Sequence, residues 1–154
     1  MTMVLLALAV PLAGCGAEPP PAVGPTGSGV AGVADPGATC PAVTGVATEL
    51  PGVADTGHSF WALLFPRGGP SLHSGREEKI VWRMTGSGSF SIQATGPDGV
   101  TVEPVWGPTR HDGSTWTRPG DEWGTGWTFP AAGCWTVRAS RSSGATGSLV
   151  LRVG

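Results

Sequence analysis

Residues 78–95 read E-K-I-V-W-R-M-T-G-S-G-S-F-S-I-Q-A-T, and this stretch decides the fold class. In its first half Ile80, Trp82 and Met84 recur at every second position, so they are expected on one face of a strand. Residues 89–95 alternate between polar and apolar side chains in the same way. A period of two residues is typical of β-strands, because successive side chains point to opposite faces. The stretch therefore predicts two strands, each with one face in a core.

After its first residues the chain shows further short strands and no helical periodicity. The glycines in residues 86–88 predict a hairpin turn between the first two strands, and residues 96–99, G-P-D-G, predict another turn. Seven short strands separated by turn signals favour an antiparallel β-sandwich with immunoglobulin-like, Greek-key connections. A small β-barrel is the alternative architecture. The other five predicted strands are residues 58–65, 101–106, 123–129, 134–141 and 147–153.

The amino end has the features of an export signal. Residues 4–12 form an apolar run of nine residues, which is too short to span a membrane because a spanning helix needs about 20. Such a run followed by small residues is typical of a secretory signal. The segment Leu12-Ala13-Gly14-Cys15 resembles the bacterial lipobox. The resemblance implies removal of residues 1–14 as a signal peptide, acylation of Cys15 with diacylglycerol and palmitate, and a lipid anchor on the extracytoplasmic side of the cell membrane.

The other two cysteines are predicted to form a disulfide. Once Cys15 is assigned to the lipid, Cys40 and Cys134 remain, an even number in a compartment where disulfides persist. In the chain-entropy model, closing so long a loop contributes about 4.6 kcal/mol. The alternative is a pair of unbonded thiols in a cytosolic domain. Neither cysteine has a C-x-x-C partner or a histidine at zinc-ligand spacing, so a metal site is not predicted from them.

Composition divides the chain into a tail and one domain. It has 154 residues, of which 26 are Gly and 15 are Pro, and all eleven aromatic residues lie between Phe60 and Trp135. Residues 15–39, rich in Pro, Gly and Ala, cannot bury enough apolar surface to fold and are predicted to be a disordered tether. Residues 40–154 are then the β-sandwich domain. The net charge of −2 excludes the basic footprint of a nucleic-acid binder.

Residues 126–137 read G-W-T-F-P-A-A-G-C-W-T-V, which resembles the G-x-x-F-P-x-x-G-C-W-x-V signature of uncharacterised secreted proteins and lipoproteins of bacteria. The earlier F-W-x-L-L-F and K-I-V-W-R segments are similar to that family too. The resemblance covers roughly residues 40–153, and it implies an envelope-facing β-sandwich with no established activity. In physical terms Pro130 and Gly133 are expected to shape a turn, and Trp135 to fill the core beside the disulfide.

The stretch of residues 106–123 is the candidate binding site, because loops rarely need three indoles. Indole faces interleaved with charged groups suit sugar rings, whose C–H faces stack on the rings while hydroxyls bond to the polar rim. Tryptophan and arginine are also the usual anchors of protein interfaces. In the third interpretation the rings cap the core of the sandwich. The candidate ligand-binding residues are Trp106, Trp116, Trp123, Arg110, Asp112 and Arg118.

Catalysis is not predicted. His58, His73 and His111 lie in loops or at the mouth of a strand, and the sequence contains no G-x-S-x-G, H-E-x-x-H or phosphate-binding motif. His111, Asp112, Asp121 and Glu122 could form a metal site, but polar residues in a loop are usually solvated, so neither a metal nor a cofactor is predicted. The sequence thus predicts a monomeric, lipid-anchored binding module that recognises cell-wall glycan, or alternatively an accessory lipoprotein that binds an envelope protein.

Overall fold

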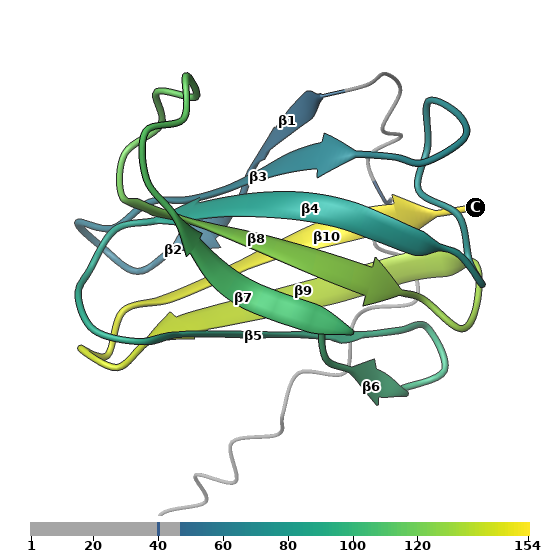
Figure 1. Ribbon diagram of the computed structural model, residues 1–154. Helices are drawn as coiled ribbons and strands as arrows, with labels where there is room; N and C mark the ends of the chain where they lie inside the picture. Colours follow the sequence, from purple (N-terminus) through teal and green to yellow (C-terminus); the bar gives the residue numbers. More distant parts are fainter. Residues whose placement is uncertain (1–39, 41–46) are drawn as a thin grey trace, which may run out of the picture. The chain divides into compact units, whose positions relative to one another are not determined.

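The computed structural model describes Cys40 and residues 47–154, which form two antiparallel sheets of five strands each (Figure 1). Sheet A has the order β1-β3-β4-β8-β7 and sheet B the order β2-β10-β9-β5-β6. The strands are β1 (Thr48–Pro51), β2 (Val53–Ala54), β3 (Phe60–Phe65), β4 (Glu77–Met84), β5 (Phe90–Thr95), β6 (Thr101–Val102), β7 (Trp106–His111), β8 (Asp121–Thr128), β9 (Gly133–Arg141) and β10 (Thr146–Val153).

The predicted β-sandwich is confirmed, and the sheets do not close into a barrel. The order β3-β4-β8-β7 in one sheet and β10-β9-β5-β6 in the other corresponds to the A-B-E-D and G-F-C-C′ strands of an immunoglobulin-like sandwich. The short strands β1 and β2 extend the two sheets at one edge. In Figure 1 sheet A lies in front of sheet B, and the core lies between them.

The prediction of a hairpin at residues 86–88 is wrong. Strand β4 pairs with β3 and β8, whereas β5 pairs with β6 and β9, so the connection crosses from one sheet to the other. Gly86 and Gly88 adopt φ of +101° and +87°, a region that favours glycine in a hairpin and in a crossing alike. The alternation pattern fixes only which face of each strand is apolar. Here the two apolar faces meet across the core instead of lying side by side.

The prediction of one continuous strand over residues 101–106 is also wrong. The chain forms the two-residue β6 there, leaves sheet B, and begins β7 of sheet A at Trp106. A register shift interrupts the pairing of β7 with β8 between Trp106 and Thr109, next to a cis Gly107–Pro108 bond. Proline cannot donate a ladder hydrogen bond, so its place on an edge strand is the expected one.

The core is built from stacked aromatic rings. Phe60 stacks on Trp82 with ring centroids 5.5 Å apart, and Trp127 stacks on Phe129 at 5.7 Å. Trp135 is fully buried, as predicted. The alternating residues that the sequence placed in the core are buried in the structure, namely Ile80, Trp82, Met84, Phe90, Ile92, Ala94, Val137 and Ala139.

One threonine hydroxyl satisfies two of the buried indoles. Thr125 Oγ1 accepts the Nε1–H of Trp82 at 2.7 Å and that of Trp127 at 2.8 Å. The same hydroxyl donates to the carbonyl oxygen of Ile80 at 2.9 Å. A hydroxyl has one donor and two acceptor positions, so Thr125 uses all of them. Thr125 lies on β8, between β4 and the edge strand β7, and is wholly buried.

The predicted Cys40–Cys134 disulfide is present, with Cα atoms 5.6 Å apart. Cys134 lies at the start of β9, and Cys40 is buried. The bond therefore ties the chain ahead of β1 to a central strand of sheet B. Cys15, the signal peptide over residues 1–14 and the tether over residues 15–39 lie outside the described residues.

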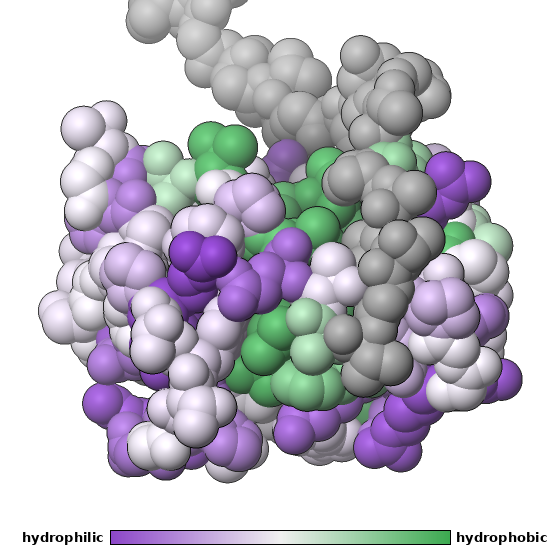
Figure 2. Space-filling view, turned by 90° about the horizontal axis from the view of Figure 1, so that it is seen from above, coloured by the Kyte–Doolittle hydropathy of each residue, from purple (hydrophilic) through white to green (hydrophobic). Residues whose placement is uncertain are grey.

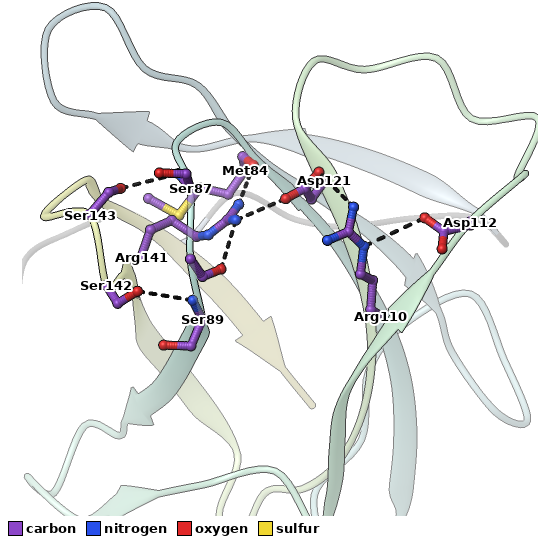
Figure 3. A network of polar contacts seen from close by, with 10 residues as sticks. Met84, Ser87, Ser89, Arg110, Asp112, Asp121, Arg141, Ser142 and Ser143 are labelled. Carbon is purple, nitrogen blue, oxygen red and sulfur yellow. Dashed lines mark hydrogen bonds and ion pairs between the residues drawn. The ribbon is translucent and has the colours of Figure 1, made fainter.

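A buried arginine joins the two sheets at one end of the sandwich (Figure 3). Arg141 at the end of β9 is 3% exposed. Its guanidinium donates to the carbonyl oxygens of Met84 and Gly88 at 3.1 and 2.9 Å, and pairs with Asp121 at 2.8 Å. Because Asp121 begins β8 of sheet A, the contact crosses the core. Buried charges of this kind must be paired and hydrogen-bonded. Both terminal nitrogens of Arg141 are bonded, whereas its buried Nε has no hydrogen-bond partner among the described residues.

Candidate functional site

The outer face of sheet A, directed away from sheet B, carries apolar side chains where a sandwich would ordinarily be polar. Residues paired across neighbouring strands share a face, and the register pairs Trp61 with Arg83, Leu63 with Val81 and Phe65 with Lys79. Figure 2, seen from above, looks onto the edge of the sandwich at which β1 lies and shows hydrophobic surface between polar side chains there. We call the half-buried large apolar side chains on the outer side of sheet A the aromatic face, and they are Trp61, Leu63, Phe65, Trp106 and Trp116.

Trp106 reaches the aromatic face from the edge strand β7. Its position over the sheet is allowed by Gly126, since a Cβ at that residue would overlap the indole Nε1. The Nε1–H donates to Glu77 Oε1 at 3.1 Å, and Glu77 also pairs with Arg67 at 3.2 Å. The indole of Trp106 is thus held by its hydrogen bond to Glu77, and it packs against the backbone of Gly126.

Trp116 and Arg118 reach the face from the loop between β7 and β8. Both side chains end on Glu49 of β1: Trp116 Nε1 lies 2.9 Å from Oε1, and Arg118 Nε lies 2.6 Å from Oε2. The Arg118 guanidinium also stacks over the ring of Trp61 at 4.1 Å. This arrangement brings together Trp116 and Arg118, two of the candidate residues, and it adds Trp61 and Glu49.

A second carboxylate holds the same loop. Glu122 Oε2 accepts from Arg83 Nε at 2.9 Å and from the Ser114 hydroxyl at 2.6 Å. Arg83 also donates to the carbonyl oxygen of Arg118 and lies 5.8 Å from the ring of Trp116. Arg83 and Arg118 are therefore each paired with a carboxylate.

The remaining candidates lie elsewhere. Trp123 is 6% exposed and stacks on Phe90 with centroids 4.3 Å apart, so the core interpretation holds for this ring. Arg110 pairs with the exposed Asp112 at 3.5 Å and with Asp121 at 3.3 Å (Figure 3). Asp121 in turn pairs with Arg141, so Arg110 is connected to the contacts by which Arg141 joins the two sheets.

The histidines do not form a common site. His58 and His111 are exposed. His73 Nδ1 lies 3.8 Å from Oε1 of Glu78, which is fully buried. That carboxylate also accepts the backbone N–H groups of Arg67 and His73 at 2.6 and 3.1 Å, so it anchors the loop after β3. In the part of the chain that the structure describes, no three His, Cys, Asp or Glu side chains gather to hold a metal.

A groove of about 690 Å³ lies over the outer face of sheet B, between β2, β5, β9 and β10. Its volume is in the range of small-ligand sites. The lining mixes hydroxyl, amide and charged side chains with small aliphatic ones such as Val53 and Ala54, and it contains no aromatic ring, in contrast to the aromatic face on the opposite sheet. We call it the sheet B groove; its polar lining includes Ser91, Gln93, Thr136, Arg138, Ser140 and Ser148.

Asp55, at the rim of the sheet B groove, gives a pH-dependent prediction. Its carboxylate accepts the hydroxyl of Thr146 at 2.8 Å and the backbone N–H of Thr146 at 2.7 Å, and these bonds lower the pKa of Asp55 below its ordinary value. A lowered folded pKa stabilises the fold above the unfolded pKa, and the stabilisation is lost as pH falls through the folded pKa. The difference in unfolding free energy between wild type and Asp55→Asn is expected to be largest near neutral pH. In urea titrations it should shrink below about pH 4; a difference independent of pH would contradict the assignment.

No helix in the described part of the chain is long and apolar enough to cross a membrane. The resemblance of residues 126–137 to secreted bacterial proteins stays a prediction. Compared with known proteins, the chain matches no family model, no curated protein and no solved structure.

Proposed function

We propose that the protein is a lipid-anchored, non-catalytic binding module of the bacterial cell envelope that recognises glycan through its aromatic face. The observation that carries this proposal is the presence of three indoles, from Trp61, Trp106 and Trp116, on the outer face of one sheet. A sandwich has no structural need for large rings on the side away from its core. Flat rings at a surface suit the C–H faces of sugars.

The rings are held in position before any ligand arrives. The indole N–H groups of Trp106 and Trp116 are bonded to Glu77 and Glu49, and Trp61 lies under the guanidinium of Arg118. Side chains fixed in this way lose little further conformational entropy on binding, which favours affinity. The arginines beside them are paired with carboxylates, so the face offers stacking more than net charge. This supports an uncharged sugar as the contacted part of the ligand.

The cellular setting is part of the proposal. The lipobox at Cys15 and the tether over residues 15–39 would anchor the module to the membrane and hold it at a distance from the surface. The Cys40–Cys134 disulfide supports an oxidising compartment outside the cytosol.

An envelope protein is the second candidate partner. Leu63 and Phe65 lie half-buried in the same strand as Trp61, and they add aliphatic and aromatic surface that sugar stacking does not require. Tryptophan and arginine surrounded by such surface are typical anchors of protein interfaces. Capture of a protein by crosslinking, with no binding to glycan, would favour this alternative.

The test is co-sedimentation of the full chain with purified cell wall and with insoluble neutral polysaccharides. A stacked ring contributes about 1.5 kcal/mol, so Trp106→Ala and Trp116→Ala should each weaken binding roughly tenfold. Gln93→Ala, in the sheet B groove, is the matched control and should bind as wild type does. Loss of binding in the control alone would move the site to that groove, and failure of the wild type to bind any glycan would refute the proposal.

A further inference from the structure

Glu49 occupies a position that links the amino-terminal edge of the domain to the aromatic face. It lies on β1, the edge strand of sheet A, while its two partners lie 67 and 69 residues further along the chain. One carboxylate oxygen accepts from Trp116, and the other accepts from Arg118. Both side chains therefore depend on the same group for their orientation.

The contacts continue from Glu49 to a third member of the face. Arg118, held by Glu49, stacks over Trp61 on the neighbouring strand β3. Glu49 is paired with Leu63 across β1 and β3, which places its carboxylate on the outer side of the sheet. Glu49 thus orients the Trp116 indole directly, and it holds Arg118 in its position over the Trp61 ring.

Strand β1 is a short edge strand. It has four residues, pairs with β3 alone among the described strands, and contributes the partly buried Leu50 to the core. Short edge strands belong to the part of a fold that opens most easily. Since Glu49 bridges this strand to the loop between β7 and β8, the strand and the loop stabilise each other.

We propose that Glu49 is the positioning residue of the aromatic face, so that docking of β1 onto β3 assembles the binding surface. The consequence for ligand binding rests on the proposed function, whereas the positioning can be observed without any ligand. Cys40 precedes β1 in the chain and is bonded to β9. That bond keeps the amino-terminal side of the domain attached to sheet B, so a pull along the tether would reach β9 before it reached β1.

The experiment records the indole N–H signals of the labelled full chain by NMR, with Trp116→Phe identifying the Trp116 signal. Glu49→Ala removes the acceptor, and we expect the Trp116 signal to shift and its N–H to exchange with solvent at least about tenfold faster. Glu49→Gln keeps an oxygen acceptor and should retain the wild-type signal. Glu103→Gln, an exposed carboxylate at the sheet B groove, is the matched control and should change nothing.

The signals of the buried Trp82 and Trp127 report whether each variant is folded. Unchanged exchange at Trp116 in a folded Glu49→Ala variant would overturn the positioning role, whatever the binding result. If the Trp116 signal moves as expected while even the wild type binds no glycan, the positioning role is supported and the proposed function fails. If wild type sediments with glycan, Glu49→Ala should weaken that binding about tenfold, and unaltered binding would overturn the link between β1 and the site.

Discussion

Replacing both Cys40 and Cys134 with serine is expected to lower the free energy of unfolding by about 4.6 kcal/mol, the largest effect among these predictions. The bond spans a sequence separation of 94 residues, so its removal releases nearly the whole domain from a covalent constraint in the unfolded state. Long loops gain the most from closure, because an unconstrained chain of that length explores many more conformations.

Urea unfolding at neutral pH, followed by near-ultraviolet circular dichroism, measures this loss. Reduction of the wild-type protein should give the same midpoint as the double variant, which separates the effect of the bond from the effect of the serine hydroxyls. A single substitution, Cys40→Ser, should behave like the double variant. A loss below about 2 kcal/mol would show that the reduced chain keeps its amino-terminal segment ordered without the bond.

Thr125→Val is expected to cost about 4 kcal/mol, although the two side chains have nearly the same shape. The substitution leaves the indole N–H groups of Trp82 and Trp127 buried without an acceptor, and each such group costs roughly 1–3 kcal/mol. Both rings are completely buried, so water cannot replace the hydroxyl. The added methyl group recovers little, because the site is already filled.

Thr125→Ser is the matched control, since it retains the hydroxyl and removes only a methyl group, at a cost of about 1 kcal/mol. Unfolding in urea compares the three proteins, and the indole N–H signals of Trp82 and Trp127 should move in the valine variant alone. Equal stability of the valine and serine variants would contradict the role of the hydroxyl.

The core of this fold could be predicted from sequence because its strands alternate. The period of two predicts that Ile80, Trp82 and Met84 share one face, and all three are buried. The same period extended by two positions reaches two buried charged residues. Glu78 precedes Ile80 by two positions, and Arg141 follows Ala139 by two. Both are buried and hydrogen-bonded, although charged residues are ordinarily expected at the surface.

Which strands pair could not be predicted in the same way. A glycine-rich connection allows a hairpin and a crossing between sheets equally, so residues 86–88 were misassigned. The strands β1 and β2 have only four and two residues, so they lack the length that a periodic pattern requires. Their existence depends on partners that are remote in the chain.

Only part of the candidate site could be predicted, because some of its residues are brought together by strand pairing between segments remote in the chain. Trp116 and Arg118 are near each other in sequence, and the structure holds them at one carboxylate. Trp61 lies far from them in sequence inside an apolar strand, and Glu49 lies in a segment without aromatic residues, so only the register of β1 and β3 brings them in. Trp123 falls in the same stretch as Trp116, but the alternation of β8 turns its ring into the core.

The most direct test of a glycan-binding aromatic face is a titration of the full chain with soluble, uncharged oligosaccharides released from cell wall, followed through the seven tryptophan indole signals. A ligand stacked on the face should shift the signals of Trp61, Trp106 and Trp116 with one common dissociation constant. The signals of the buried Trp82, Trp127 and Trp135 should stay in place. No shift in the first group at millimolar oligosaccharide, with a protein shown to be folded by the second group, would contradict the proposal.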